Sequence, residues 1–282
     1  MSDTWVFYTR SVGSAGTLGG SFTPDAALVR TDASIPSIPR VGFFRRAMAP
    51  GEWDGLALAI RSLGAPRPSG RHSPGTPMVS VGIMAKGRAE VVHGQPSGAL
   101  SLPEREVFSK VETFVEEVMR KHPHKALEAG AAWERESVEP DDDVTVLFEV
   151  KNPGLVPVPF AHPSARSAAS SGFSVVLARV GANGVTVEAR EVVFTPAEVV
   201  EVGPDGKVLK GPYGEVVELA PGKEARFRAR TRLRLVPASY RATARLDLDA
   251  PEGSDDKAVS GTIVVELPAL AVVRPGERGG NP

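Results

Sequence analysis

Residues Ala225 to Leu235 read A-R-F-R-A-R-T-R-L-R-L, with an arginine at every second position. A period of two predicts a half-buried β-strand, because successive side chains of a strand point to opposite faces of its sheet. One face would turn Phe227 and Leu233 into a core. The other face would hold a row of guanidinium groups at the surface, so this stretch predicts a two-sided sheet strand.

A second stretch, from Tyr240 to Leu248, alternates in the same way and would extend the basic face if the two strands pair. The candidate partner-binding residues are Arg226, Arg228, Arg230, Arg232, Arg234, Arg241 and Arg245. Arginine binds carboxylates through two parallel hydrogen bonds, so the face would suit an acidic protein partner. The alternative is a solvated face whose arginines pair with carboxylates of neighbouring strands, namely Glu188, Glu215, Glu218, Asp247 or Asp249.

The rest of the C-terminal half predicts an all-β domain over residues 144–273. Short alternating stretches recur between turn signals such as the one at 181–184, which is typical of a β-sandwich. The opening V-T-V-L-F-E-V-K-N-P-G at 144–154, the turn L-A-P-G at 219–222 and the P-A-S-Y at 237–240 resemble bacterial immunoglobulin-like modules. The resemblance implies an immunoglobulin-like β-sandwich.

The N-terminal half predicts a small α+β domain over residues 1–125. An apolar stripe at helical spacing favours one helix from Pro50 to Leu63, and the capping-box residues Ser101 and Glu104 begin a second. Strands are expected at 5–8, 27–29, 78–84 and 89–92, with a glycine-rich loop or hairpin at 13–20. We therefore expect an antiparallel sheet with two helices on one side. The glycine-rich opening and this element order are similar to small bacterial inhibitor domains of the emfourin type.

Between these domains, residues 126–143 are expected to form a linker. The run A-G-A-A at 129–132 has little structural propensity, and Asp141, Asp142 and Asp143 form a charged run. Residues 274–282 are expected to form a tail.

Composition narrows the class of protein. The 282 residues have a formal net charge of −1, which makes a nucleic-acid partner unlikely. There is no cysteine, which excludes disulfides and thiolate metal sites. We find neither a secretory signal nor an apolar run of roughly 18 residues, so we expect no membrane span and a cytoplasmic location.

Catalytic and cofactor motifs give no positive signal. The sequence has no G-x-S-x-G and no histidine–carboxylate pattern typical of a metal site, so we expect no catalytic residues, no metal and no cofactor. The leading hypothesis is a non-enzymatic protein-binding module, either an inhibitor, an immunity or adaptor protein, or an assembly subunit. The alternative is a hydrolase with a site between the two domains. The sequence does not fix the partner or the oligomeric state.

Overall fold

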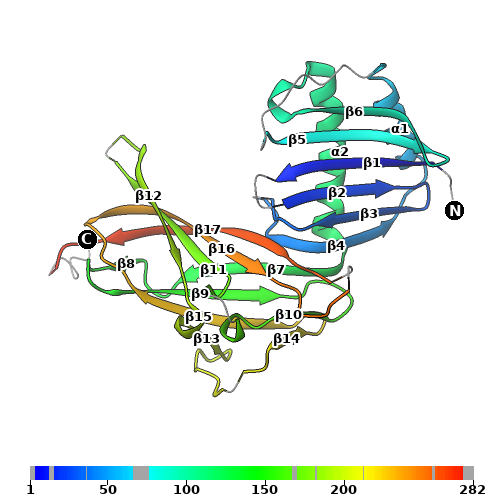
Figure 1. Cartoon of the computed structure of the whole chain (residues 1–282). Coiled ribbons are helices and arrows are strands. Elements are labelled where there is room, and N and C mark those ends of the chain that lie inside the picture. Colours follow the sequence, from blue (N-terminus) through cyan, green and yellow to red (C-terminus); the bar gives the residue numbers. More distant parts are fainter. Residues whose placement is uncertain are drawn as a thin grey trace. The chain divides into compact units, whose positions relative to one another are not determined.

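The computed structural model describes residues 4–12, 16–35, 37–65, 76–166, 170–181, 183–211, 213–255 and 258–275. The chain forms two compact units, of which the first contains Met1–Ala126 and Pro153–Val156. The second contains Leu127–Asn152 and Pro157–Pro282. Both units are built mainly from antiparallel strands, and the two α-helices among the described residues belong to the first unit (Figure 1).

The first unit is an antiparallel sheet in the order β4-β3-β2-β1-β5-β6. Its strands are β1 Thr4–Val12, β2 Gly16–Phe22, β3 Ala26–Thr31, β4 Arg40–Ala47, β5 Met78–Ala85 and β6 Arg88–Pro96. Two helices, α1 Glu52–Arg61 and α2 Leu102–Lys121, pack on this sheet and share one apolar core with it. The predicted antiparallel sheet with two helices is thereby confirmed.

The capping box that predicts α2 is present. The backbone N–H of Ser101 donates to Glu104 Oε2 at 2.7 Å, and the Ser101 hydroxyl lies 2.6 Å from the same oxygen. Between the sheet and this helix, the hydroxyl of Tyr8 in β1 donates to Oε1 of Glu112 in α2 at 2.8 Å. Burial and the Glu112 carboxylate both raise the pKa of Tyr8, so this phenol stays a donor at neutral pH.

Glycines interrupt the hydrophobic alternation in two strands of this unit, β2 and β4. The stretch at 13–20, expected as a glycine-rich loop or hairpin, contributes the first residues of strand β2, which forms an antiparallel hairpin with β1 from Val12 opposite Gly16. A Cβ at Gly20 would meet the Phe22 ring at 2.4 Å, so a larger residue there would displace a core aromatic. Strand β4 was not predicted. Its Gly42 has φ 126°, and a Cβ there would meet the Lys125 carbonyl oxygen at 2.3 Å.

The second unit contains two larger antiparallel sheets and a strand pair. The strands are β7 Pro123–Trp133, which includes the boundary between the units, β8 Ser137–Val138, β9 Asp143–Lys151, β10 Val158–Ala161, β11 Phe173–Val180, β12 Thr186–Val193, β13 Val199–Val202, β14 Val216–Leu219, β15 Glu224–Arg232, β16 Ala238–Leu248 and β17 Gly261–Val272. One sheet has the order β13-β15-β9-β7, the second has the order β12-β11-β16-β17-β8, and β10 pairs with β14. The β17–β8 contact alone is parallel among these described pairs.

The two larger sheets of the second unit contact each other through aromatic rings. The Phe173 ring of β11 lies 4.7 Å from Phe148 of β9 and 5.6 Å from Phe227 of β15, measured between centroids. Phe227 is fully buried, and Leu233 is 5% exposed. The predicted two-sided pattern of the arginine-rich stretch is therefore confirmed.

Residues 126–143, expected as a linker, contain most of β7 and all of β8. Strand β7 pairs with β9 from Glu128 opposite Lys151 to Trp133 opposite Val146. The Trp133 indole N–H donates to the Pro268 carbonyl at 2.8 Å. The small side chains of this segment give no hydrophobic alternation, so its strand depends on the pairing with β9. Of the expected tail, residues 276–282 lie outside the described part of the chain.

The two faces of β15 should differ sharply in their tolerance to substitution. Phe227→Ala should lower the free energy of unfolding by about 3–5 kcal/mol, because it removes a buried ring that touches the opposite sheet. Arg230→Gln should cost under about 1 kcal/mol, because its ion pair is exposed to water. Chemical denaturation of both variants measures this difference. A larger cost for Arg230→Gln would contradict the assigned faces.

The second unit should fold alone, and β7 should add to its stability. A fragment of residues 123–282 should show a β-type circular dichroism spectrum and a cooperative melt. A fragment that begins at Glu134 lacks β7, keeps β8 and leaves one edge of β9 without its partner, so it should melt at a lower temperature. Equal melting temperatures would show that β7 adds nothing to this unit.

Candidate functional site

The predicted arginines fall on two different sheets. Strand β15 lies between β13 and β9, with Arg226 opposite Glu149 and Arg228 opposite Leu147. The arginines of this outer face are Arg226, Arg228, Arg230 and Arg232, and Arg234 follows the end of the strand. Strand β16, which holds Arg241 and Arg245, pairs with β11 and β17 instead of β15. The expected extension of the basic face by β16 is therefore wrong.

Carboxylates from β9 and β15 itself neutralise part of the arginine row. Arg226 Nε lies 3.2 Å from Glu149 Oε2, and its Nη2 lies 2.6 Å from Glu224 Oε1. Arg230 forms a two-nitrogen contact with Asp143, in which Nε lies 2.8 Å from Oδ2. These guanidinium groups are already occupied by carboxylates of the same chain.

The end of the row contacts the segment before β9. Arg232 Nε donates to the Asp141 carbonyl at 3.2 Å, and Arg234 Nε lies 4.0 Å from Asp141 Oδ1. The idea that neighbouring carboxylates pair with the row is right in kind. None of the carboxylates named from the sequence pairs with the arginines of β15 among the described residues, because β9 and β13 are its neighbours, whereas Asp247 pairs with Arg245 of β16.

Arg228 differs from the other arginines of β15. Its Nη2 donates to the Gly206 carbonyl at 3.0 Å, and its Nε lies 3.4 Å from Glu134 Oε1. That second contact lacks hydrogen-bond geometry, so the buried Nε has no hydrogen-bond partner among the described residues. Among the described residues, Arg228 therefore has one backbone hydrogen bond and one long carboxylate contact, fewer than its five N–H donors could make.

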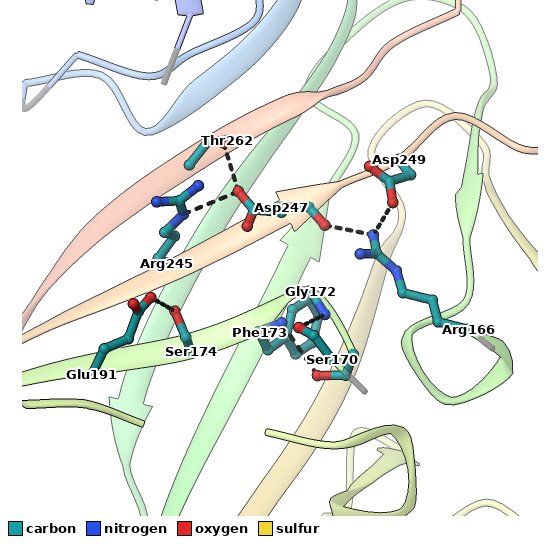
Figure 2. A network of polar contacts seen from close by, with 11 residues as sticks. Arg166, Ser170, Gly172, Phe173, Ser174, Glu191, Arg245, Asp247, Asp249 and Thr262 are labelled. Carbon is teal, nitrogen blue, oxygen red and sulfur yellow. Dashed lines mark hydrogen bonds and ion pairs between the residues drawn. The ribbon is translucent and has the colours of Figure 1, made fainter. Parts of the chain in front are cut away.

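Arg245 belongs to a polar network on the other sheet (Figure 2). Its Nε lies 3.1 Å from Asp247 Oδ1, which also accepts from the Thr262 hydroxyl at 2.6 Å. Arg166 binds the same strand end, with Nη2 at 2.6 Å from the Asp247 carbonyl and 3.1 Å from Asp249 Oδ2. These contacts hold the end of β16 and give Arg245 a partner within the chain.

A hollow of about 540 Å³ lies on the outer face of the sheet that contains β15, and we call it the β15 hollow. It is lined by Gly130, Ala131, Ala132, Leu147, Phe148, Glu149, Val202, Gly203, Pro204, Asp205, Gly206, Arg226 and Arg228. In the row of residues paired across the strands, Ala132 lies opposite Leu147, which lies opposite Arg228. Small side chains on β7 leave space beside an apolar residue and a guanidinium group.

The turn at 203–206 forms one wall of the β15 hollow. Gly203 N–H donates to the Lys207 carbonyl at 2.8 Å, and Gly206 N–H donates to the Gly203 carbonyl at 2.9 Å. Lys207 and the backbone hydrogen bond at its N–H lower the pKa of the Asp205 carboxyl, which forms an ion pair with Lys207 Nζ at 3.0 Å. The sequence marks 203–206 as a turn. It does not predict that this turn and β7, which are separated by β15 and β9, line the same hollow.

His162, one of the five histidines of the chain, is buried and contacts Glu201 of β13. Its Nδ1 accepts from the Ser164 N–H at 3.1 Å, and its Nε2 lies 3.4 Å from Glu201 Oε2. The Tyr213 ring stacks on it at 4.7 Å. Burial lowers the pKa of His162 below its ordinary value of 6.5, and the Glu201 carboxylate opposes that shift. The imidazole is therefore neutral at pH 7 and links two loops.

The described residues contain no group of three or more histidine, cysteine, aspartate or glutamate side chains placed to hold a metal ion. Within the same ranges, neither helix is long and apolar enough to cross a membrane.

The sequence matches no protein-family model and no curated protein. Similar solved structures include the DNA glycosylase AlkC of Pseudomonas fluorescens, with 9% identity and a TM-score of 0.25, where 58% of this chain covers 37% of that one. AvmM, which catalyses macrocyclization in alchivemycin A biosynthesis, has 15% identity, a TM-score of 0.27 and coverages of 50% and 88%. The sporulation control protein Spo0M of Bacillus subtilis has 14% identity, a TM-score of 0.24 and coverages of 50% and 49%. Likenesses of this size support no inference about function.

The buried His162 should make stability depend on pH. Its pKa is lower in the folded state than in the unfolded state, so the unfolded state binds more protons and stability should fall as pH drops below about 6.5. His162→Gln should reduce the fall in melting temperature between about pH 7.5 and 5.5. Ser164→Ala, which keeps the imidazole, is the matched control. Equal pH dependence in wild type and His162→Gln would contradict this assignment.

Proposed function

We propose that the protein is a non-enzymatic binding module that docks a segment of another protein in the β15 hollow. Arg228 is the observation on which the proposal depends. Its Nε is buried without a hydrogen-bond partner among the described residues, at the border of a hollow large enough for side chains of a partner. Its one carboxylate contact among the described residues is the 3.4 Å contact with Glu134, so a partner carboxylate in the hollow would add a charge-assisted hydrogen bond to this guanidinium group.

The surroundings of Arg228 define the chemistry of the segment. Leu147 and Ala132 lie beside it in the same row, so an apolar side chain would fit there. A carboxylate next to that side chain would bind Arg228, because a charge-assisted hydrogen bond is stronger than a neutral one. Arg226 and Arg230 already pair with Glu149 and Asp143. The proposed ligand is thus one acidic residue beside an apolar one, rather than a polyanion.

We also propose that the second unit is an immunoglobulin-like sandwich. Two antiparallel sheets in contact through Phe148, Phe173 and Phe227, together with the turn at 219–222, support this assignment. Such a fold hosts many activities, so the proposed function depends on the β15 hollow and not on the fold. An inhibitor, an immunity or adaptor protein and an assembly subunit would all use a docking surface of this kind.

The proposal is tested with the full chain as bait in extracts of the source cell. A captured protein would be identified by mass spectrometry and its affinity measured with purified components. Arg228→Gln should weaken binding about tenfold or more, because a hydrogen bond to a charged group contributes about 1.5–3 kcal/mol. Ala132→Leu, which fills the hollow, should weaken binding as well.

The matched control is Arg232→Gln, on the same strand but outside the lining of the hollow. It should leave affinity unchanged, and all three variants should melt near the wild-type temperature. If Arg228→Gln and Ala132→Leu both bind like wild type, the β15 hollow is not the docking surface.

A further inference from the structure

Strand β12 is an exposed edge of the second unit. It forms the end of the sheet β12-β11-β16-β17-β8 and pairs with β11 on one side only. Of its residues only Val192 is buried, while Val187 is 63% exposed and Val193 is 47% exposed. Figure 1 shows the β11–β12 hairpin reaching beyond the rest of its sheet. An exposed edge of this kind offers unpaired N–H and C=O groups to another strand.

Strands β13 and β17 are protected against pairing with another chain. At β13, the Leu209 N–H donates to the Glu201 carbonyl at 3.0 Å, so the following segment covers the edge. At β17, strand β8 pairs with the C-terminal end, and Pro268 lies within the strand. Proline is a common device against edge pairing. Strand β12 contains neither proline nor glycine, and its pairing with β11 is regular from Glu188 to Val193, with one irregularity before Glu188.

The hydrogen bonds to β11 show which backbone groups of β12 are free. Phe194, just after the strand, donates its N–H to the Phe173 carbonyl at 3.0 Å. Since the direction alternates along a strand, Arg190 and Val192 also direct their backbone groups to β11. Ala189 and Glu191 direct theirs away from it, toward the open side.

A second copy of β12 can pair with this open side in few registers. In an antiparallel pair, two opposite residues either both direct their backbone groups toward the partner strand or both direct them away from it. In a symmetric pair, one residue therefore lies opposite its own copy, and the twofold axis passes between the two. An axis at Glu188 or at Arg190 would place like charges opposite each other. An axis at Ala189 places Glu188 opposite Arg190 of the second copy, twice. The same register pairs the outward-directed backbone groups of Ala189 with each other.

We propose that two copies of this chain associate through antiparallel pairing of β12, with the twofold axis at Ala189. Charge complementarity selects a second copy of β12 as the partner. Glu188 and Arg190 lie one position on either side of the axis, so each meets the opposite charge of the other copy. Arg190 forms no ion pair within the described part of the chain, and Glu188 forms one exposed contact, to Arg179 at 3.6 Å. The dimer gives Arg190 a carboxylate partner and covers the apolar edge. This interface is independent of the β15 hollow.

A charge-swap series on the full chain tests the interface by sedimentation equilibrium. Glu188→Arg and Arg190→Glu each place like charges opposite each other twice, so each should weaken dimerisation about tenfold. The double variant Glu188→Arg/Arg190→Glu restores opposite charges and should recover dimerisation close to wild type. Arg88→Glu, an exposed charge change on β6, should have no effect.

Backbone pairing is tested independently by hydrogen exchange. The amides of Ala189 and Glu191 should gain protection as protein concentration rises, while the amide of Arg190, bonded to β11, should not change. Ala189→Pro removes one outward N–H without removing a bond to β11, so it should give a folded monomer. A monomer at all concentrations would overturn the proposal, and so would a dimer that the charge swaps leave unchanged.

Discussion

The burial of Phe227 between two sheets is the constraint on which the second unit depends. Its ring contacts Phe173 of the opposite sheet. Because side chains alternate along β15, this contact determines which face of the sheet each other residue of the strand points to. A slip of one residue would turn Arg226 and Arg228 toward the core, where unpaired guanidinium groups are very costly. One aromatic contact therefore determines that the arginine row faces outward, and the position of Arg228 beside the β15 hollow follows from it.

Local patterns predicted elements whose residues determine their own conformation. The alternation of β15 and the capping box of α2 were both found in the structure. Strand β7 was missed, and β2 was expected only as part of a loop or hairpin, for a physical reason. Their glycines and alanines have no hydrophobic period, and they become strands because a neighbour supplies the pairing, as β9 does for β7.

The candidate site was predicted only in part, because it depends on contacts between distant segments. Arg226 and Arg228 were recognised from the sequence, and the turn at 203–206 was recognised as a turn. The neighbour of β15 was not predictable, since an alternating strand pairs equally well with β9 or β16. That choice decides the electrostatics. Pairing with β9 supplies Glu149 to the row and leaves Arg228 opposite Leu147, so a basic strip becomes a hollow in which Arg228 has only a long carboxylate contact, to Glu134.

The β15 hollow and the proposed dimer both lie at sheet edges, one covered and one open. The segment that follows β13 covers that edge through the Leu209–Glu201 hydrogen bond, and the turn at its start forms a wall of the β15 hollow. The same residues thus protect an edge and form the hollow. Among the described residues, strand β12 has no such cover, although an uncovered edge favours uncontrolled association. In the proposed dimer, the charges at 188 and 190 would limit that association, because they meet like charges in the two adjacent registers and opposite charges in the one with its axis at Ala189. An edge whose charges favour one register would be less prone to open-ended aggregation.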